Sequence, residues 1–173
     1  MPRSYPAVLP IAYVVLRILI VFNWLMGAAI LVLLLAMPNE QWIMSAFKLT
    51  PSPEADRLVL GLRVIATIGL ITIPLNHFLL TRLVAIVETV RTGDPFVAAN
   101  AHRLQAIAWT LLALQLLGMV IGGIVDFIST RAHPVDVDAG FSINGWLAVL
   151  LTFVLARVFA EGTAMREELE GTV

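Results

Sequence analysis

Four long apolar stretches are the feature that most constrains how this chain can fold. A helix needs about 20 mostly apolar residues to cross the hydrocarbon core of a bilayer, and it satisfies every backbone polar group within that core. The stretches therefore predict an all-α, polytopic protein built as a single membrane domain. The four expected transmembrane helices span about residues 14–37, 58–87, 103–128 and 141–162.

The composition agrees with a membrane protein. Of the 173 residues, 60% are hydrophobic and 13% are charged, whereas soluble domains average about 45–50% apolar and about 25% charged residues. The net charge of -1 gives no reason to expect direct nucleic-acid binding. The absence of cysteine excludes disulfides and thiolate metal sites. The first apolar run is longer than a signal-peptide core of about 7–15 residues, so we expect it to be retained as the first helix.

The basic residues fall into two groups when the chain is threaded through four spans. One side holds Arg3, Arg17, Arg82, Arg91, Arg103, Arg157 and Arg166. The other side holds Lys48, Arg57, Arg63 and Arg131. Cytoplasmic loops carry the excess of Lys and Arg, so we expect the first side to be cytoplasmic. This places both termini in the cytoplasm.

Polar side chains inside the spans are candidates for a function within the bilayer, because they are costly in hydrocarbon. Asn76 and His77 follow Pro74 within one helical turn, where the carbonyl freed by the proline and these side chains would line a small hydrated cavity. The alternative is an interhelical hydrogen bond of about 0.6–2 kcal/mol. Asp126 ends the third span; it is either a proton or cation site or a polar group that marks the membrane exit.

The third span contains two glycines four residues apart, Gly118 and Gly122, followed by Gly123. This spacing permits close approach of another helix. It predicts packing within the chain, and a homodimer through the Gly118/Gly122 face is the alternative.

No catalytic, cofactor-binding or metal-binding residues are expected. The chain has no HExxH metal pair, no GxSxG nucleophile elbow and no pair of aspartates within the spans. His102 and His133 lie outside the core on opposite sides, so neither is at the depth of His77 to share a haem. We therefore do not expect an enzyme.

The inner loop, VRTGDPFVAANAHRLQ, carries local folding signals. Gly93 suits a turn, Asp94 a helix N-cap and Pro95 the first helical position. Phe96 would then reach toward the membrane as an anchor. The side chains expected to project from the short helix that follows are Asn100 and Arg103.

The C-terminal segment continues the fourth span as an amphipathic cytoplasmic tail over 158–173. One stripe at helical spacing consists of Val158, Gly162, Met165 and Leu169. Charged residues occupy the other faces.

The inner loop and the tail resemble a bacterial membrane family, domain of unknown function 2975. The resemblance implies a multi-pass protein of the bacterial cytoplasmic (inner) membrane. Its G-x-PF…N…L pattern is matched here by Gly93, Pro95, Phe96, Asn100 and Leu104. Its G-x-x-L-x-x-E…TV tail is matched by Gly162, Glu168, Thr172 and Val173, with Met165 and Gly171 in place of the usual leucines. The four-span layout resembles the family along the whole chain.

The family has no established activity, so what the resemblance implies about function comes from the genes that lie beside those of its members. Its members are often encoded beside small helix-turn-helix regulators, which implies a membrane regulator that sequesters, or senses for, such a transcription factor. The implied partner-binding residues are Gly93, Pro95, Phe96, Asn100, Arg103, Gly162, Glu168, Thr172 and Val173. The alternative for these positions is structural: a turn, a cap and an interface anchor.

A second function remains open beside regulation. A small transporter, channel or immunity-type protein would use Asn76, His77 and Asp126 as a polar path. A proton-coupled exporter normally needs an acidic residue near the midplane, and none of the spans offers one. The sequence therefore favours regulation, with the lipid bilayer as the surrounding partner.

Overall fold

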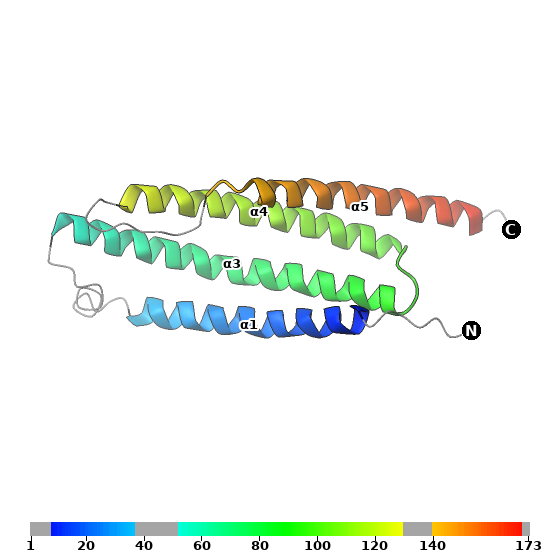
Figure 1. Ribbon diagram of the computed structural model, residues 1–173, viewed down its shortest axis with the longest axis horizontal. Coiled ribbons are helices and arrows are strands. Elements are labelled where there is room, and N and C mark those ends of the chain that lie inside the picture. The colour runs from blue at the N-terminus through cyan, green and yellow to red at the C-terminus, as the bar shows by residue number, and fades with distance from the viewer. Residues whose placement is uncertain (1–7, 37–51, 130–139, 171–173) are drawn as a thin grey trace. The chain divides into compact units, whose positions relative to one another are not determined.

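The computed structural model describes residues 8–36, 52–129 and 140–170. The described helices are α1 (Val8–Ala36), α3 (Pro53–Arg91), α4 (Ala98–Ile128) and α5 (Ile143–Glu170), and Figure 1 shows them. The prediction of an all-α chain with four long helices is confirmed. Two residues of the implied docking set, Thr172 and Val173, lie outside the described residues.

All four helices are long and apolar enough to cross a membrane. The shortest, α5, has 28 residues, and at about 1.5 Å per residue it measures about 42 Å, more than the hydrocarbon thickness of about 30 Å. Between 11% and 22% of the most apolar window of each helix is buried inside the chain. Most of the apolar surface is thus left for lipid, which indicates a multi-pass membrane protein.

All four described helices extend beyond the expected spans at one or both ends. Helix α3 begins at Pro53 because Ser52 caps it: the Ser52 Oγ accepts a hydrogen bond from the Ala55 backbone N–H at 3.2 Å. Proline is favoured at the first helical position, where its missing N–H costs nothing. Helix α5 runs from Ile143 to Glu170 without a break, so the tail continues the apolar helix.

The connection between α3 and α4 is a glycine-terminated turn. Gly93 has a φ of 90°, a left-handed conformation that glycine adopts without strain. Its N–H donates to the Val90 carbonyl at 3.1 Å, and the Asp94 N–H donates to the Thr89 carbonyl at 3.0 Å. This pair of bonds is the Schellman motif, which closes a helix C-terminus.

The expectation that α4 starts at Asp94 and Pro95 is wrong, because the helix starts at Ala98. The Asp94 N–H is already used to close α3. The first turn of α4 is instead marked by the Asn100 N–H, which donates to the Val97 carbonyl at 2.8 Å. Residues 94–97 therefore form a non-helical loop.

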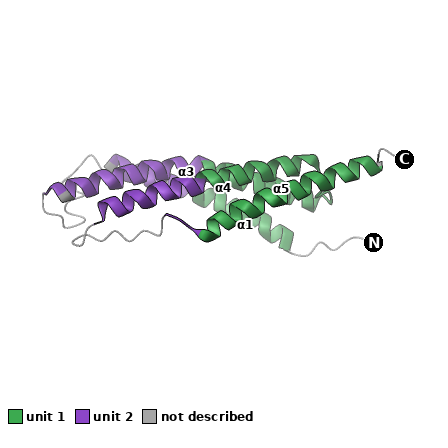
Figure 2. Cartoon of the chain, turned by 90° about the horizontal axis from the view of Figure 1, so that it is seen from above, with its two compact units in different colours: residues 1–23, 75–113, 143–173 green, residues 24–74, 114–142 purple. Residues whose placement is uncertain are grey.

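The described residues fall into two compact units (Figure 2), and α1, α3 and α4 each contribute to both. By residue number, unit 1 takes 1–23, 75–113 and 143–173, and unit 2 takes 24–74 and 114–142. Within α3 the division follows Pro74, through which the helix runs on.

Unit 2 is held together by close approach of apolar groups. The small core consists of Ala55, Leu58 and Ile128, with Leu62, Ile65 and Ile124 packed against it. Gly61 of α3 lies against Ile128 of α4: a Cβ built on the glycine would be 2.4 Å from the isoleucine Cγ2. A Cβ on Gly27 of α1 would lie 3.0 Å from Ile73 of α3. Glycine at these positions lets the helices approach closely.

Unit 1 packs partly through aromatic side chains. Trp109 of α4 meets Phe153 of α5 edge-to-face, with ring centroids 5.2 Å apart. Leu104, Ile107 and Ala108 of α4 are buried. The ring contact joins α4 to α5.

A candidate docking surface on the 94–97 loop and the end of α5

Asn100 ties the loop to both of its flanking helices. Its Nδ2 donates to the Pro95 carbonyl at 2.9 Å and to the Thr89 Oγ1 at 2.7 Å, and its Oδ1 accepts from Arg103 at 2.8 Å. The Asn100 side chain is 0% exposed. The expectation that it projects from the helix is therefore wrong, because its side chain is buried. Any role that Asn100 has in partner binding is to hold the loop in place.

Arg103 extends the same network toward α3. Besides its bond to Asn100, its Nη1 donates to the Ala85 carbonyl at 3.4 Å. The side chain is half-buried. Part of the hydrogen-bonding capacity of its guanidinium is therefore used within the chain, where it links α3 to α4. These N–H donors are not available to a partner.

Two loop side chains reach across to α5. The Phe96 ring stacks on Phe159 with centroids 5.2 Å apart, and the Asp94 carboxylate forms an ion pair with Arg166. A Cβ on Gly162 would lie 3.5 Å from Phe96, which is ordinary van der Waals contact. These five residues, Asp94, Phe96, Phe159, Gly162 and Arg166, are named the loop–tail surface here.

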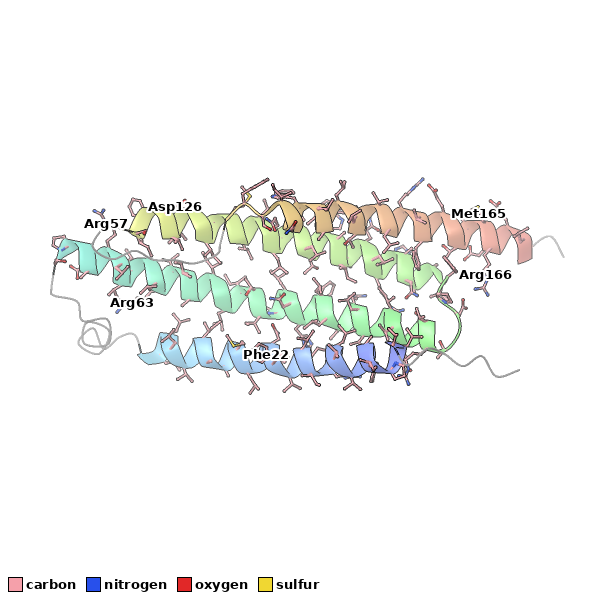
Figure 3. All side chains as sticks on the ribbon, viewed as in Figure 1. Phe22, Arg57, Arg63, Asp126, Met165 and Arg166 are labelled. Carbon is pink, nitrogen blue, oxygen red and sulfur yellow. The ribbon has the colours of Figure 1, made fainter. Side chains whose placement is uncertain are left out.

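The loop–tail surface joins the two segments that carried the family resemblance. Phe96 contacts α5 and is still 46% exposed, so it anchors the loop to a helix of its own chain. In Figure 3 the Arg166 side chain leaves α5 toward the loop, whereas Met165 leaves it in another direction. Glu168 is exposed on the same helix.

A groove runs beside the loop–tail surface, between the first turns of α4 and the second half of α5. Its volume is about 510 Å³. Small side chains make up much of its wall, and polar ones stand among them. The lining residues are Ala98, Ala101, His102, Gln105, Phe153, Ala156, Arg157, Ala160, Thr163, Ala164 and Glu167.

Charged residues at the groove are partly paired within α5. Arg157 donates to Glu161 one turn later at 2.7 Å, and both side chains are well exposed. Glu167 lies farther along α5 and is exposed. The groove therefore offers small apolar surface next to an exposed carboxylate.

The three polar residues predicted inside the spans are not gathered at this groove. Asn76 and His77 are half-buried on α3, where the His77 carbonyl accepts a hydrogen bond from Thr81 at 2.9 Å. Asp126 is exposed near the end of α4 (Figure 3). None of the three lines the groove. Across residues 8–36, 52–129 and 140–170, no group of three or more His, Asp or Glu side chains is placed to hold a metal ion.

The two glycines predicted as a dimer face differ in their surroundings. Gly122 is buried, and a Cβ on Gly140 would lie 3.9 Å from its Cα. A Cβ on Gly118 would meet open space. Gly122 therefore packs within the chain, as predicted, whereas Gly118 does not. A homodimer through this face stays a prediction.

Sequence reasoning missed Thr89 and Phe159. Thr89 accepts from Asn100 through its hydroxyl and from Asp94 through its carbonyl. Phe159 supplies the ring on which Phe96 stacks. Neither residue stands in a motif. Phe159 gains its role because α5 approaches the loop, and Thr89 gains its role in the turn between α3 and α4.

Comparison with known proteins identifies a family and no individual relative. Neither the curated proteins nor the solved structures gave a match to the chain. The family match covers residues 37–173, which include α3, α4, α5 and the whole loop–tail surface. Helix α1 lies outside the family match. The resemblance to the family, which was expected along the whole chain, is therefore shown for α3, α4 and α5. The chain belongs to the family described as "Protein of unknown function (DUF2975)".

Proposed function

We propose that this chain is a non-enzymatic regulator in the bacterial cytoplasmic (inner) membrane, with both termini in the cytoplasm. Its partner is a small helix-turn-helix transcription factor, which the chain holds at the membrane or releases. The partner binds at the loop–tail surface and in the adjoining groove between α4 and α5.

The distribution of basic residues supports this orientation. The residue ranges of unit 1 contain seven of the 11 Lys and Arg residues, and they also contain both terminal segments and the 94–97 loop. The side of a membrane protein that carries the excess of Lys and Arg stays in the cytoplasm. A cytoplasmic partner would therefore meet unit 1.

The observation that carries the docking proposal is that the loop and the end of α5 are already in contact at the loop–tail surface. The Phe96–Phe159 stack and the Asp94–Arg166 ion pair hold the loop against α5, and Asn100 fixes the loop from within. A surface that is already ordered loses little conformational entropy when a partner binds. Small groove residues leave room for a helix of the partner.

Charge complementarity favours a basic partner. The described end of α5, residues 157–170, contains Arg157 and Arg166 against four glutamates. Both arginines are engaged with acidic residues of the chain, and Glu167 stands at the groove. DNA-binding proteins carry basic surfaces, and opposite potentials steer such partners together.

The test is a pull-down with the full-length, detergent-solubilised chain as bait, followed by reconstitution with the purified regulator. Ala164→Trp fills the groove, and Met165→Trp is its matched control because Met165 is exposed and does not line the groove. A truncation after Glu161 removes the remainder of the tail.

We expect a small DNA-binding protein to be recovered with the native chain and with Met165→Trp. Ala164→Trp and the truncation should weaken binding by about tenfold or more, which is a loss of about 1.4 kcal/mol or more. Equal binding to Ala164→Trp would show that the groove is not the docking site. Failure to recover a regulator with any bait would refute sequestration altogether.

A further inference from the structure

We propose that Tyr13, Arg17 and Arg91 bind the phosphate of an anionic phospholipid in the cytoplasmic leaflet. The proposal rests on the orientation proposed above, which puts the end of α3 on the cytoplasmic side, but it does not depend on a protein partner. All three residues belong to unit 1. Two come from α1 and one from the last turn of α3.

Two guanidinium groups gather on a single tyrosine ring. The Arg17 Cζ lies 5.3 Å from the Tyr13 ring centroid, and the Arg91 Cζ lies 5.0 Å from it. The Arg17 Nη2 also donates to the Tyr13 hydroxyl at 3.0 Å. Cation–π attraction at such distances holds each cation at the ring, although the two positive charges repel each other.

The positive charge of this group is only partly compensated. Arg91 forms an ion pair with Glu88 at 3.0 Å. No carboxylate of the described residues pairs with Arg17, which is exposed. One positive charge is thus left over, and Arg17 keeps most of its five N–H donors for another acceptor.

The surroundings of Arg17 indicate that the acceptor comes from a lipid. Exposed apolar side chains flank it on α1, among them Val14 at 55% and Ile18 at 61%. Such a surface faces lipid rather than water. An arginine within it is stable only if its head reaches the headgroup layer or an anion.

The depth of the group agrees with the headgroup layer. Arg91 is the last residue of α3, and its contact with Tyr13 places that part of α1 level with the end of α3. Basic groups between membrane helices on the cytoplasmic side bind anionic headgroups. The guanidinium fork suits a phosphate, to which it donates two parallel hydrogen bonds.

Native mass spectrometry of the full chain tests the site by titration with phosphatidylglycerol and, separately, phosphatidylcholine with the same acyl chains. We expect phosphatidylglycerol to bind more tightly than phosphatidylcholine. Arg17→Gln should weaken phosphatidylglycerol by about fivefold or more, because one basic residue near an anionic surface contributes on that scale. Arg91→Gln should weaken it as well.

Arg157→Gln is the matched control, since Arg157 is also exposed in unit 1 but is paired with Glu161. It should bind phosphatidylglycerol as the native chain does. Arg17→Lys keeps the positive charge but lacks the two parallel donors of the guanidinium, so it should bind phosphatidylglycerol with intermediate affinity. This variant tests the role of Arg17 even if Arg17→Gln does not fold.

Three outcomes would overturn the proposal. Equal binding of the two lipids would show that charge is not recognised. Unchanged phosphatidylglycerol binding by both Arg17→Gln and Arg91→Gln would place the lipid elsewhere. Displacement of phosphatidylglycerol by millimolar inorganic phosphate would identify the ligand as free phosphate rather than a lipid headgroup.

Discussion

The two compact units are held together by different chemistry. Unit 1 is fixed by directional contacts: the hydrogen bonds of Asn100, the stack of Phe96 on Phe159 and the ion pair of Asp94 with Arg166. Unit 2 relies more on close apolar contact around its core, where Gly61 meets Ile128, although the Arg57 guanidinium over the Phe127 ring also links α3 to α4 there. The first kind of contact specifies which groups meet, and the second specifies how closely helices approach.

The difference has a physical reason in the surroundings of each set of contacts. Lipid is as apolar as a leucine side chain, so helices in a bilayer associate through tight packing of small residues rather than through apolar burial. The contact of Gly27 with Ile73, well inside α1 and α3, is of this kind. A loop between helices has backbone polar groups that need partners. Asn100 supplies such a partner to the Pro95 carbonyl.

The largest effect is expected for Asn100→Ala in unit 1. The substitution removes all three side-chain hydrogen bonds and leaves the Pro95 carbonyl and the Thr89 hydroxyl without this partner. Each buried polar group left unsatisfied costs about 1–3 kcal/mol, so the free energy of unfolding should fall by about 3 kcal/mol. SDS titration in mixed detergent micelles measures it.

Asn76→Ala is the matched control for that experiment. Asn76 is only half-buried on α3 and lies outside the loop network, so its substitution should cost less than half as much. If Asn100→Ala and Asn76→Ala destabilise the chain equally, unit 1 is not held by the polar network.

A smaller effect is expected for Gly61→Ala in unit 2. The new Cβ would stand 2.4 Å from the Ile128 Cγ2, so the helices must separate or Ile128 must move. Overpacking of this kind costs about 1–3 kcal/mol, and we expect about 2 kcal/mol in the same SDS titration. Gly118→Ala is the control, because its Cβ meets open space.

Adding Ile128→Ala to Gly61→Ala sharpens the test. The second substitution removes the clashing atoms, so the double variant should lose less stability than the two single losses combined. Strict additivity would show that Gly61 does not make its contact with Ile128.

The smallest effect is expected for the ion pair of unit 1. The Asp94 and Arg166 side chains are 46% and 48% exposed, and exposed pairs contribute about 0.2–1 kcal/mol. Asp94→Asn should therefore lower the free energy of unfolding by less than about 1 kcal/mol, and high salt should reduce the difference between variant and native chain.

Exchanging the charges, Asp94→Arg with Arg166→Asp, gives the corresponding control. The exchanged pair should recover most of the stability lost by Asp94→Arg alone. If the exchanged chain is no more stable than the single variant, the attraction between these two side chains does not contribute to unit 1.

Local signals in the sequence predicted part of the loop correctly. Gly93 was expected in a turn, and its positive φ and Schellman bonds confirm this. The start of α4 was not predictable in the same way. Asp94 and Pro95 form a good local helix start, but the Asp94 N–H closes α3 and its carboxylate pairs with Arg166 of α5. Contacts with distant helices outweighed the local preference.

The residues of the family pattern illustrate the same limit. Asn100 was predicted as a contact residue, and its position in the pattern was compatible with either an exposed or a buried side chain. The packing of α4 against α3 decided for burial, because only there do Thr89 and the Pro95 carbonyl lie within reach.

The sequence by itself determined that this chain forms four long apolar helices, because backbone polar groups in lipid have to be satisfied within each segment. It also determined the turn at Gly93, because few other residues adopt a positive φ without strain. Only the tertiary structure decided that the loop meets the end of α5, that Asn100 is internal, and that Arg17 and Arg91 share the Tyr13 ring. The contacts of the loop with α5 and of α1 with α3 join residues far apart in the chain, and the burial of Asn100 depends on how α4 meets the turn before it. A periodic apolar pattern does not encode which helix faces lie together.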